Sequence, residues 1–472
     1  MIFRIPLDQR KERMETFKVS KEYSTKTRIT ERTVAVAEAF GIGIDEEKRF
    51  AVFNSFMVDI KPGQVVLITG DSGSGKSTLL RELAAQIANC EDRSFGTVAT
   101  NESVKIDQDE LIIEGVGRDV SDAISTLSMS GLNEAFLMLR KFKELSDGQK
   151  YRYRAAKMID SNADTWIFDE FAALLDRVTA KCVSYTIQKV ARKLGKTLLV
   201  ATTHEDLLDD LKPDVWIRKK FGEEVSVTEF KKDQFEKECT LLKEAKIEPC
   251  RLSELEPLEK FHYRGKVLAI VKNCFKVTID NNLVGGIVYV TPHLALKGRN
   301  KALPEFRGKQ SRELALKINA EITRISRVIV VPKFRSIGLG AELVRRTMPL
   351  VGKKYIEVLA VMSRFNPIFE KAGMTRVDVE ENESLEKDLR KLEHIGLNRK
   401  LLNSRKHTTK VISSLRTEDL ATCASFALKY CAVAKQRATS LIPKIKALDR
   451  QSIVDALKLY SSRPVYLYWI NK

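Results

Sequence analysis

Long apolar stretches are missing from this chain of 472 residues. Its longest uninterrupted apolar runs, such as 65–68 and 328–331, have the length of a β-strand, whereas a bilayer-spanning helix needs about 20 apolar residues. The sequence therefore argues against an integral membrane protein. The first ten residues carry charges where a secretory signal peptide has its apolar core, so we expect a cytoplasmic location.

Paired cysteine motifs and an excess of acidic residues are missing as well. The seven cysteines are odd in number and lack CxxC spacing, which indicates reduced thiols rather than a disulfide framework or a zinc site. Basic residues outnumber acidic ones by 81 to 63, which gives a net charge of +18. This excess suits a polyanionic partner such as nucleic acid, but it carries no information about the fold.

Hydrophobic patterning in the first half of the chain predicts an α/β fold. Short apolar runs rich in branched residues at 65–69, 166–168 and 197–202 read as strands, and helical patterns follow at 76–88 and 178–192. Strands that alternate with helices favour a mostly parallel sheet with both faces covered. With 43% hydrophobic residues the chain can bury ordinary globular cores.

We expect three parts along the chain, at 1–232, 247–383 and 384–472. The charged stretch 231–246 separates the first α/β block from a second block that is rich in predicted strands. From 384 onward the sequence becomes basic and helix-like, with 18 basic and 7 acidic residues, a net charge of 18 − 7 = +11. The chain closes with the strand-like segment 464–470.

The strongest local signal is Gly-Asp-Ser-Gly-Ser-Gly-Lys-Ser at 70–77, which follows a predicted strand and opens a predicted helix. Its glycines let successive backbone N–H groups point at phosphate oxygens, and the helix start adds partial positive charge. We expect Lys76 to neutralise the β- and γ-phosphates of ATP and the Ser77 hydroxyl to bind Mg²⁺. The residues expected to hold the nucleotide are Gly70, Ser72, Gly73, Ser74, Gly75, Lys76, Ser77 and Thr78.

Two acids end the predicted strand that begins at Thr165. Asp169 is expected to hold Mg²⁺, and Glu170 to polarise the water that attacks the γ-phosphate in line. The strand 197–202 delivers His204. Taken alone, an Asp-Glu pair is usually a solvated strand end and a single histidine is usually structural.

Together these motifs resemble the ATP-binding cassette (ABC) ATPases over residues 34–230. The resemblance identifies 70–77 as Walker A, Asp169 and Glu170 as Walker B with its catalytic glutamate, and His204 as the switch histidine. It implies a P-loop fold that hydrolyses MgATP.

The Leu-Ser-Asp-Gly-Gln sequence at 145–149 matches the ABC signature, with Asp147 in place of a glycine, and 173–176 matches the D-loop. In this family the signature of one cassette completes the nucleotide site of another. The resemblance therefore implies an ATP-dependent homodimer with these signature residues at the shared nucleotide: Ser146, Gly148 and Gln149.

Two further positions follow from the ABC resemblance. Phe40, about thirty residues before Gly70, fits the aromatic that stacks on adenine, although a core role is equally compatible with the pattern. Gln108 is the glutamine in the region of the Mg²⁺-binding Q-loop, but its flanks differ from the family pattern. Only 146 − 76 = 70 residues separate Lys76 from Ser146, so the helical subdomain is short, which favours a soluble ABC ATPase over a transporter subunit.

A second glycine-rich turn follows the predicted strand 325–331. Arg335, Gly338 and Gly340 form an Arg-x-x-Gly-x-Gly pattern directly before a predicted helix at 341–346. A strand that feeds a glycine-rich turn at a helix start predicts another anion cradle, here without a P-loop lysine.

The order of elements over residues 250–379 resembles the GNAT acetyltransferases. That resemblance implies that the three residues of the second turn bind the pyrophosphate of acetyl-CoA. It also implies that Ile329 and Val331 offer backbone groups to the pantetheine arm, and that Asn366 faces the thiol.

One departure from the GNAT pattern concerns the proton donor. The family tyrosine that protonates the departing thiolate is Phe369 here, and a phenyl ring donates no proton. Tyr289 or water would have to serve instead, or the transfer is impaired. The attacking amine must be neutral, and Glu321, directly before the strand, is our candidate for its base.

The basic segment 384–458 is interpreted as helical. Its charge favours contact with nucleic acid or a ribonucleoprotein through phosphates, since aromatic residues that could read bases are sparse. A solvated helical surface is the alternative. We expect the last segment, 465–470, to pair with 355–361, which would make the helical block an insertion within the GNAT-like sheet.

The whole chain thus resembles archaeal proteins described as an ABC-type ATPase fused to a predicted acetyltransferase. We expect ATP hydrolysis coupled to acetyl transfer from acetyl-CoA, on RNA or a ribonucleoprotein. The first alternative is a mechanochemical ATPase of repair or translation, whose second domain only binds CoA or docks a partner. The second alternative is the ATPase of a transport system, which would need a separate membrane subunit.

Overall fold

The protein divides into two compact units, residues 1–289 with 327–351 and residues 290–326 with 352–472. They are seen in a computed structural model, which describes residues 14–25, 28–43, 48–90, 94–231, 234–235, 237–261, 269–309, 311–378, 383–431, 440–460 and 464–471. The division between the units passes through a sheet, so the three expected domain boundaries stay a prediction.

The first unit contains a six-stranded sheet in the order β4-β5-β6-β3-β7-β8. Neighbouring strands are parallel except β8, which runs antiparallel to β7. The mostly parallel sheet expected from the sequence is therefore present. Its strands are β3 (Val65–Thr69), β4 (Val98–Thr100), β5 (Thr165–Phe168), β6 (Thr197–Thr202), β7 (Val215–Lys219) and β8 (Val225–Glu229).

Each face of this sheet has its own apolar core. Val65 and Leu67 of β3 pack on one side with helices α6 (Asp147–Asp160) and α7 (Arg177–Leu194). Val66 and Ile68 pack on the other side with helix α3 (Lys76–Ala88). This alternation explains the continuous apolar runs in the sequence, because a parallel strand covered on both faces has no solvent side.

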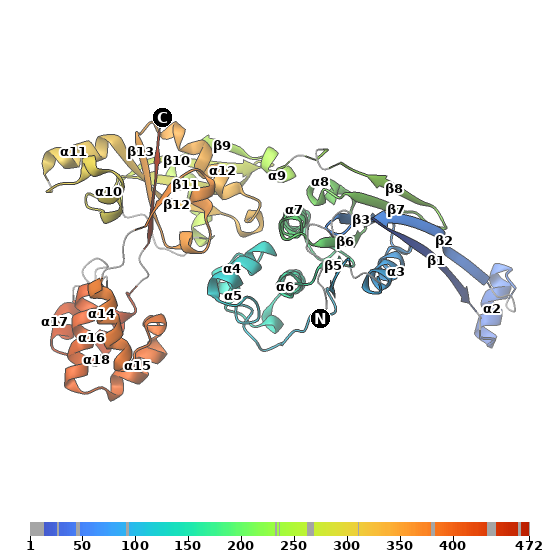
Figure 1. Ribbon diagram of the computed structural model, residues 1–472, viewed down its shortest axis with the longest axis horizontal. Helices are drawn as coiled ribbons and strands as arrows, with labels where there is room; N and C mark the ends of the chain where they lie inside the picture. Colours follow the sequence, from blue (N-terminus) through green and yellow to red (C-terminus); the bar gives the residue numbers. More distant parts are fainter. Residues whose placement is uncertain are drawn as a thin grey trace. The chain divides into compact units, whose positions relative to one another are not determined.

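A long hairpin precedes the sheet, with β1 (Glu15–Thr25) antiparallel to β2 (Lys48–Ile60). Helix α2 (Glu31–Phe40) is inserted between the two strands, at the end of the hairpin in Figure 1. Strand β1 lies against α3, where Lys21 Nζ is 2.8 Å from a Glu82 carboxylate oxygen and Gln86 donates to the Lys18 carbonyl at 3.0 Å.

A small helical subdomain lies between β4 and β5 in the chain. It contains α4 (Val120–Met129) and α5 (Ala135–Met138), and it has a core of its own that includes Leu127, Phe142 and Tyr153. Two short helices lie further along the chain: α8 (Leu208–Leu211) follows β6, and α9 (Thr240–Lys243) follows β8.

A seven-stranded sheet follows in the order β14-β15-β13-β12-β11-β10-β9. Its strands are β9 (Lys246–Pro249), β10 (Val271–Ile279), β11 (Asn282–Val290), β12 (Ile322–Val330), β13 (Tyr355–Ala360), β14 (Thr375–Val377) and β15 (Val465–Ile470). Strand β12 is parallel to β13, and β15 lies antiparallel between β13 and β14. The expected pairing of the last segment with 355–361 is thus confirmed.

Helices α10 (Lys297–Ala302) and α11 (Arg312–Glu321) follow β11, helix α12 (Leu339–Thr347) follows β12, and helix α13 (Ile368–Lys371) follows β13. A bundle with its own apolar core then connects β14 to β15, seen as one red group in Figure 1. Its helices are α14 (Glu383–His394), α15 (Arg405–Ser414), α16 (Thr417–Tyr430), α17 (Leu441–Lys446) and α18 (Arg450–Leu457). In the described part of the chain, no helix is long and apolar enough to cross a membrane.

Candidate functional site

Three parallel strands carry the nucleotide motifs to one edge of the six-stranded sheet. Thr69 at the end of β3 pairs with Thr202 at the end of β6, and β6 pairs in turn with β5. Carboxyl ends of parallel strands share an edge of the sheet. Consequently Gly70, Asp169 and His204, which follow these three strands, are brought to the same edge.

The turn after β3 forms a phosphate cradle that only glycine can build at two positions. A Cβ on Gly70 would lie 1.9 Å from the Lys219 carbonyl oxygen, and one on Gly75 would lie 2.6 Å from a Val52 methyl carbon. Gly75 has a φ of +103° and ends the turn at the start of α3, where no side chain caps the helix. The N–H groups at that helix start are thus available to an anion.

The hydroxyl of Ser74 gives an independent sign that the cradle fits a phosphate. Ser74 is buried, and its Oγ has no hydrogen-bond partner among the residues that the structure describes. A buried polar atom without a partner is uncommon in a folded protein. The other expected phosphate residues lie around it, with Ser72 and Gly73 exposed and Lys76, Ser77 and Thr78 half-buried.

Two of the expected Mg²⁺ ligands, Ser77 and Asp169, lie in contact. Ser77 Oγ donates to Asp169 Oδ1 at 2.9 Å, which joins the start of α3 to the end of β5. Lys76 Nζ donates to the Asp71 carbonyl at 2.6 Å, inside the turn. Burial lowers the pKa of Lys76, while the carboxylates of Asp71, Asp169 and Glu170 oppose that shift. A hydroxyl beside a carboxylate at a phosphate cradle suits a hard cation such as Mg²⁺.

His204 is half-buried and follows β6. Its backbone N–H donates to Thr202 Oγ1 at 3.2 Å. Near His204, Arg177, the first residue of α7, forms an ion pair with Asp206. Burial and the Arg177 charge lower the pKa of His204, and Asp206 opposes them, so the neutral imidazole is favoured.

The signature residues form the start of α6. Ser146 Oγ accepts the Gln149 N–H at 3.4 Å, and Gln149 Oε1 accepts the Ser146 N–H at 3.0 Å, a reciprocal cap. Gly148 is half-buried, and its carbonyl accepts from Arg152 Nε at 3.2 Å. Within the described residues, none of these three signature residues has a hydrogen bond to the P-loop of its own chain.

Phe40 is not the aromatic residue that reaches the start of α3. It is the last residue of α2, and its side chain is 78% exposed. Tyr23, near the end of β1, instead places its Oη 3.5 Å from Thr78 Oγ1. Spacing along the chain did not predict this Tyr23–Thr78 contact, because α2 is inserted between β1 and β2 and lengthens the interval.

Gln108 lies in the loop after β4 with an exposed side chain. Its backbone carbonyl accepts the Lys143 N–H at 3.2 Å. Across the described segments, its side-chain amide makes no hydrogen bond to Ser77 or Asp169. Its assignment as a Mg²⁺ ligand therefore stays a prediction from the sequence.

The second glycine-rich turn also lies between a strand and a helix. Gly338 has a φ of +102° and precedes the first residue of α12, and Gly340 is buried in the first turn of that helix. Ile329 is buried in β12, and the N–H of Val331 is taken by the Val284 carbonyl at 2.9 Å.

Arg335 is engaged by protein atoms. Its guanidinium donates to three backbone carbonyls, those of Val330 at 2.9 Å, Asn133 at 2.6 Å and Phe261 at 3.4 Å. A pyrophosphate at this turn would have to compete with these carbonyls for Arg335.

The residues expected to act in acetyl transfer have varied settings. Glu321 ends α11, with a carboxylate oxygen 3.8 Å from Lys354 Nζ, and Asn366 is exposed. Phe369 is buried. Tyr289, considered as a substitute proton donor, is fully buried and its hydroxyl is 2.7 Å from Thr347 Oγ1, so it is a core residue rather than an accessible acid.

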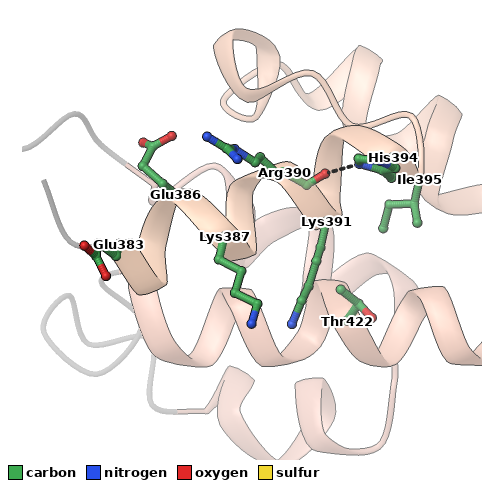
Figure 2. A pocket seen from close by; sticks show the side chains of 8 residues that line it. All are labelled: Glu383, Glu386, Lys387, Arg390, Lys391, His394, Ile395 and Thr422. Atoms are coloured by element: carbon green, nitrogen blue, oxygen red, sulfur yellow. Dashed lines mark hydrogen bonds between the residues drawn. The ribbon is translucent and has the colours of Figure 1, made fainter.

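The basic helical bundle has an open hollow of about 960 Å³ along α14. Figure 2 shows Lys387 and Lys391 pointing to the same side of this helix as Thr422 of α16. Two acids also line the hollow, Glu383 and Glu386, so its charge is mixed.

Comparisons with known proteins find similar sequences for the first part of the chain. Residues 53–173 match the family model described as "ABC transporter". The cytochrome c biogenesis ATP-binding export protein CcmA of Pseudomonas aeruginosa is 28% identical over 188 residues, 35% of this chain and 90% of that protein. The aliphatic sulfonates import ATP-binding protein SsuB 2 of Rhodococcus jostii (strain RHA1) is 29% identical over 170 residues, 33% of this chain and 67% of that protein.

A solved structure, the dimeric post-hydrolysis state of the ATP-binding cassette MJ0796 bound to ADP and Pi, is 20% identical with a TM-score of 0.35 and covers 46% of this chain and 99% of that chain. The family match spans the cradle after β3, the signature at the start of α6, and the two acids after β5. Residues 53–173 of this chain therefore contain an ABC transporter-type ATPase domain.

Proposed function

We propose that this ATPase domain hydrolyses MgATP at a site shared by two copies of the chain. The observation that carries the proposal is the contact of Ser77 with Asp169 beside the phosphate cradle, since these two groups would hold Mg²⁺ next to Glu170. In this proposal Lys76 neutralises the β- and γ-phosphates. Glu170 accepts a proton from the attacking water, and His204 stabilises the transferred phosphate. Bound Mg²⁺ would supply Lewis-acid stabilisation of the phosphate charge.

The need for a second copy follows from the position of the signature. The start of α6 is a second helix terminus suited to an anion. Its Ser146 and Gly148 make no hydrogen bond, within the described residues, to the cradle of their own chain. A second chain, related by a two-fold axis, would place each signature over the other's γ-phosphate. For the base, Tyr23 is the better stacking partner than Phe40, because it contacts Thr78 directly.

Light scattering tests the shared site. Glu170→Gln should bind ATP without hydrolysing it and accumulate as a dimer at micromolar concentration. Glu38→Gln, an exposed position on α2, should retain turnover and serve as the control. A Glu170→Gln chain that stays monomeric with saturating ATP would contradict the proposal.

We propose acetyl transfer from acetyl-CoA as a second function. It is supported by the parallel pairing of β12 with β13 and by the turn from β12 to α12, which resembles an anion cradle in its glycine at φ +102°. Labelled acetyl-CoA tests it. Gly338→Glu should abolish binding, whereas Gly352→Glu, a glycine with φ +68° and open space around it, should not. Failure of the wild-type chain to bind acetyl-CoA would remove this function and leave the ATPase untouched.

For the acceptor, we propose RNA or a ribonucleoprotein held by the basic bundle. The charge of +11 over 384–472 supports it, although the Arg399 guanidinium is already paired with Glu386 and Glu393. Fluorescence anisotropy with a short RNA should show weakening between 50 and 200 mM salt. Lys387→Glu should reduce the affinity for RNA. Tight binding that changes neither with the salt concentration nor with Lys387→Glu would count against phosphate contact.

The relatives' names support an alternative role as the ATPase of a transport system. The exposed apolar side chains of Phe136 and Leu139 at the helical subdomain would then meet a separate membrane subunit. Co-sedimentation of the chain with membranes from its source cells, lost in Phe136→Ser, would favour transport. ATPase stimulation by RNA without membrane association would favour the RNA-linked role.

A further inference from the structure

The turn that carries Glu170 has an unusual backbone. Glu170 has a φ of +49° and Ala172 a φ of +60°, and both lie in the left-handed region that residues with a Cβ rarely adopt. Such conformations are costly and persist where neighbouring groups hold them. The groups that hold this turn therefore determine where the Glu170 carboxylate points.

The backbone N–H groups of residues 170–173 each have an identified acceptor. Those of Glu170, Phe171 and Ala173 bond to atoms of the turn itself or of β6, at 2.8 to 3.1 Å. The N–H of Ala172 is different, because its acceptor is the side-chain hydroxyl of Tyr151, at 3.2 Å. Two side chains from other elements thus bond to the turn: the Tyr151 hydroxyl accepts the Ala172 N–H, and the Thr202 hydroxyl of β6 donates to the Phe171 carbonyl at 3.0 Å.

Tyr151 comes from α6, the helix that begins with the signature. Its ring is buried among Phe168 and Phe171, with centroid distances of 6.5 and 6.3 Å. Burial raises the pKa of the Tyr151 hydroxyl, so it stays protonated and uncharged. The ring has little freedom in this cluster, and a displacement of α6 would move the hydroxyl away from Ala172.

We infer that Tyr151 is a positioning residue for ATP hydrolysis, which ties the signature helix to the turn that aims Glu170. The hydroxyl holds Ala172 in its left-handed conformation and thereby holds Glu170, two residues earlier in the same turn. The second half of the inference rests on the proposed shared site: when a partner's nucleotide engages the start of α6, Tyr151 transmits that engagement to Glu170 of the same chain. Each active site would then respond to the occupancy of the other.

A single-atom change tests this role. Tyr151→Phe removes the hydroxyl and leaves the Ala172 N–H without an acceptor, which should lower kcat about tenfold with KM within about twofold. Tyr153→Phe is the matched control, since Tyr153 lies on the same helix and is equally buried, but packs against Phe142 in the subdomain core. Its kcat should stay near that of the wild type. The Hill coefficient for ATP should fall toward one in Tyr151→Phe only.

A rescue variant separates positioning from general destabilisation. Ala172→Gly adopts the left-handed conformation without strain, so it should restore part of the turnover in the Tyr151→Phe background. Equal kcat values for Tyr151→Phe and Tyr153→Phe, or no rescue by glycine, would overturn the inference.

Amide hydrogen exchange gives a readout that needs no turnover. In nucleotide-free protein, exchange across 169–173 should quicken in Tyr151→Phe and stay unchanged in Tyr153→Phe, and equal exchange in both would also overturn the inference. The two halves of the inference can fail separately. If the wild-type chain remains monomeric with ATP while exchange still differs between Tyr151→Phe and Tyr153→Phe, the shared site and the transmission between sites are wrong, and the positioning role of Tyr151 still holds.

Discussion

Replacing Tyr23 with alanine should weaken ATP binding, and replacing Phe40 should not. Stacking of a base on an aromatic side chain contributes about 1–3 kcal/mol. Tyr23 is 47% exposed and keeps one side in solvent, so we expect about 1–2 kcal/mol, which corresponds to a Kd about five to thirty times higher. Phe40→Ala removes a ring that is 78% exposed on α2 and should leave Kd within about twofold.

Isothermal titration with ATP in a Glu170→Gln background gives these affinities without turnover. Inorganic tripolyphosphate is the matched ligand, because it occupies the phosphate cradle but has no base. Its affinity should be the same in Tyr23→Ala and in the parent, and Tyr23→Phe should bind ATP normally. The Lys21 ammonium, 5.9 Å from the Tyr23 ring centroid, is held by Glu82 and should keep its place in both variants.

The opposite pattern of affinities would refute stacking of the base on Tyr23. If Phe40→Ala weakened ATP binding tenfold while Tyr23→Ala left it unchanged, the hairpin would have to carry α2 over the nucleotide. If Tyr23→Ala weakened tripolyphosphate as strongly as ATP, Tyr23 would support the fold of α3 and would not stack on the base.

Further measurements test other parts of the structure. Burial and the Arg177 charge lower the pKa of His204 from its ordinary value. Arg177→Gln should raise that pKa, so the fall of kcat on acidification should begin at a higher pH, as a pH–rate profile would show. The fully buried Arg299–Glu357 ion pair has N–O distances of 2.9 and 2.6 Å, so Glu357→Gln should lower the free energy of unfolding by about 3–5 kcal/mol. Arg299→Met combined with Glu357→Leu should recover most of that loss in urea denaturation, and a loss below about 1 kcal/mol in the single variant would contradict this. Burial raises the pKa of six thiols, to about 11 or 12 in several, so these should react with Ellman's reagent at pH 8 far more slowly than in urea: Cys182, Cys239, Cys250, Cys274, Cys423 and Cys431.

The nucleotide site could be predicted from the sequence because its parts obey local rules. A glycine-rich turn before a helix predicts its own backbone geometry, and acids or a histidine at the ends of buried parallel strands must meet at one edge. Ser77 and Asp169 are 92 positions apart in the chain and yet lie in contact, as this rule requires. The pairing of the last strand was predictable for a similar reason, since a short run of aliphatic and aromatic residues at 465–470 is typical of a strand that joins a sheet.

Interactions that depend on insertions or on side-chain direction could not be predicted in this way. Phe40 has the expected spacing from Gly70, but it lies on α2 with an exposed side chain, whereas Tyr23 of β1 lies near Thr78. The sequence gives no sign of the contact that Tyr151 makes, because only the three-dimensional structure brings its hydroxyl to Ala172. The carbonyls that engage Arg335 lie up to 202 positions away in the chain, and no local pattern indicates them.

The late position of β15 in the chain has a consequence for biosynthesis. Leu467 pairs with Val358, more than a hundred positions earlier, and the five helices of the bundle emerge from the ribosome in between. Until β15 emerges, β13 and β14 each present an unpaired edge, the kind of surface on which nascent chains associate. The bundle can meanwhile form its own core, so a nascent chain stalled before residue 465 would carry a folded bundle beside an unfinished, association-prone sheet.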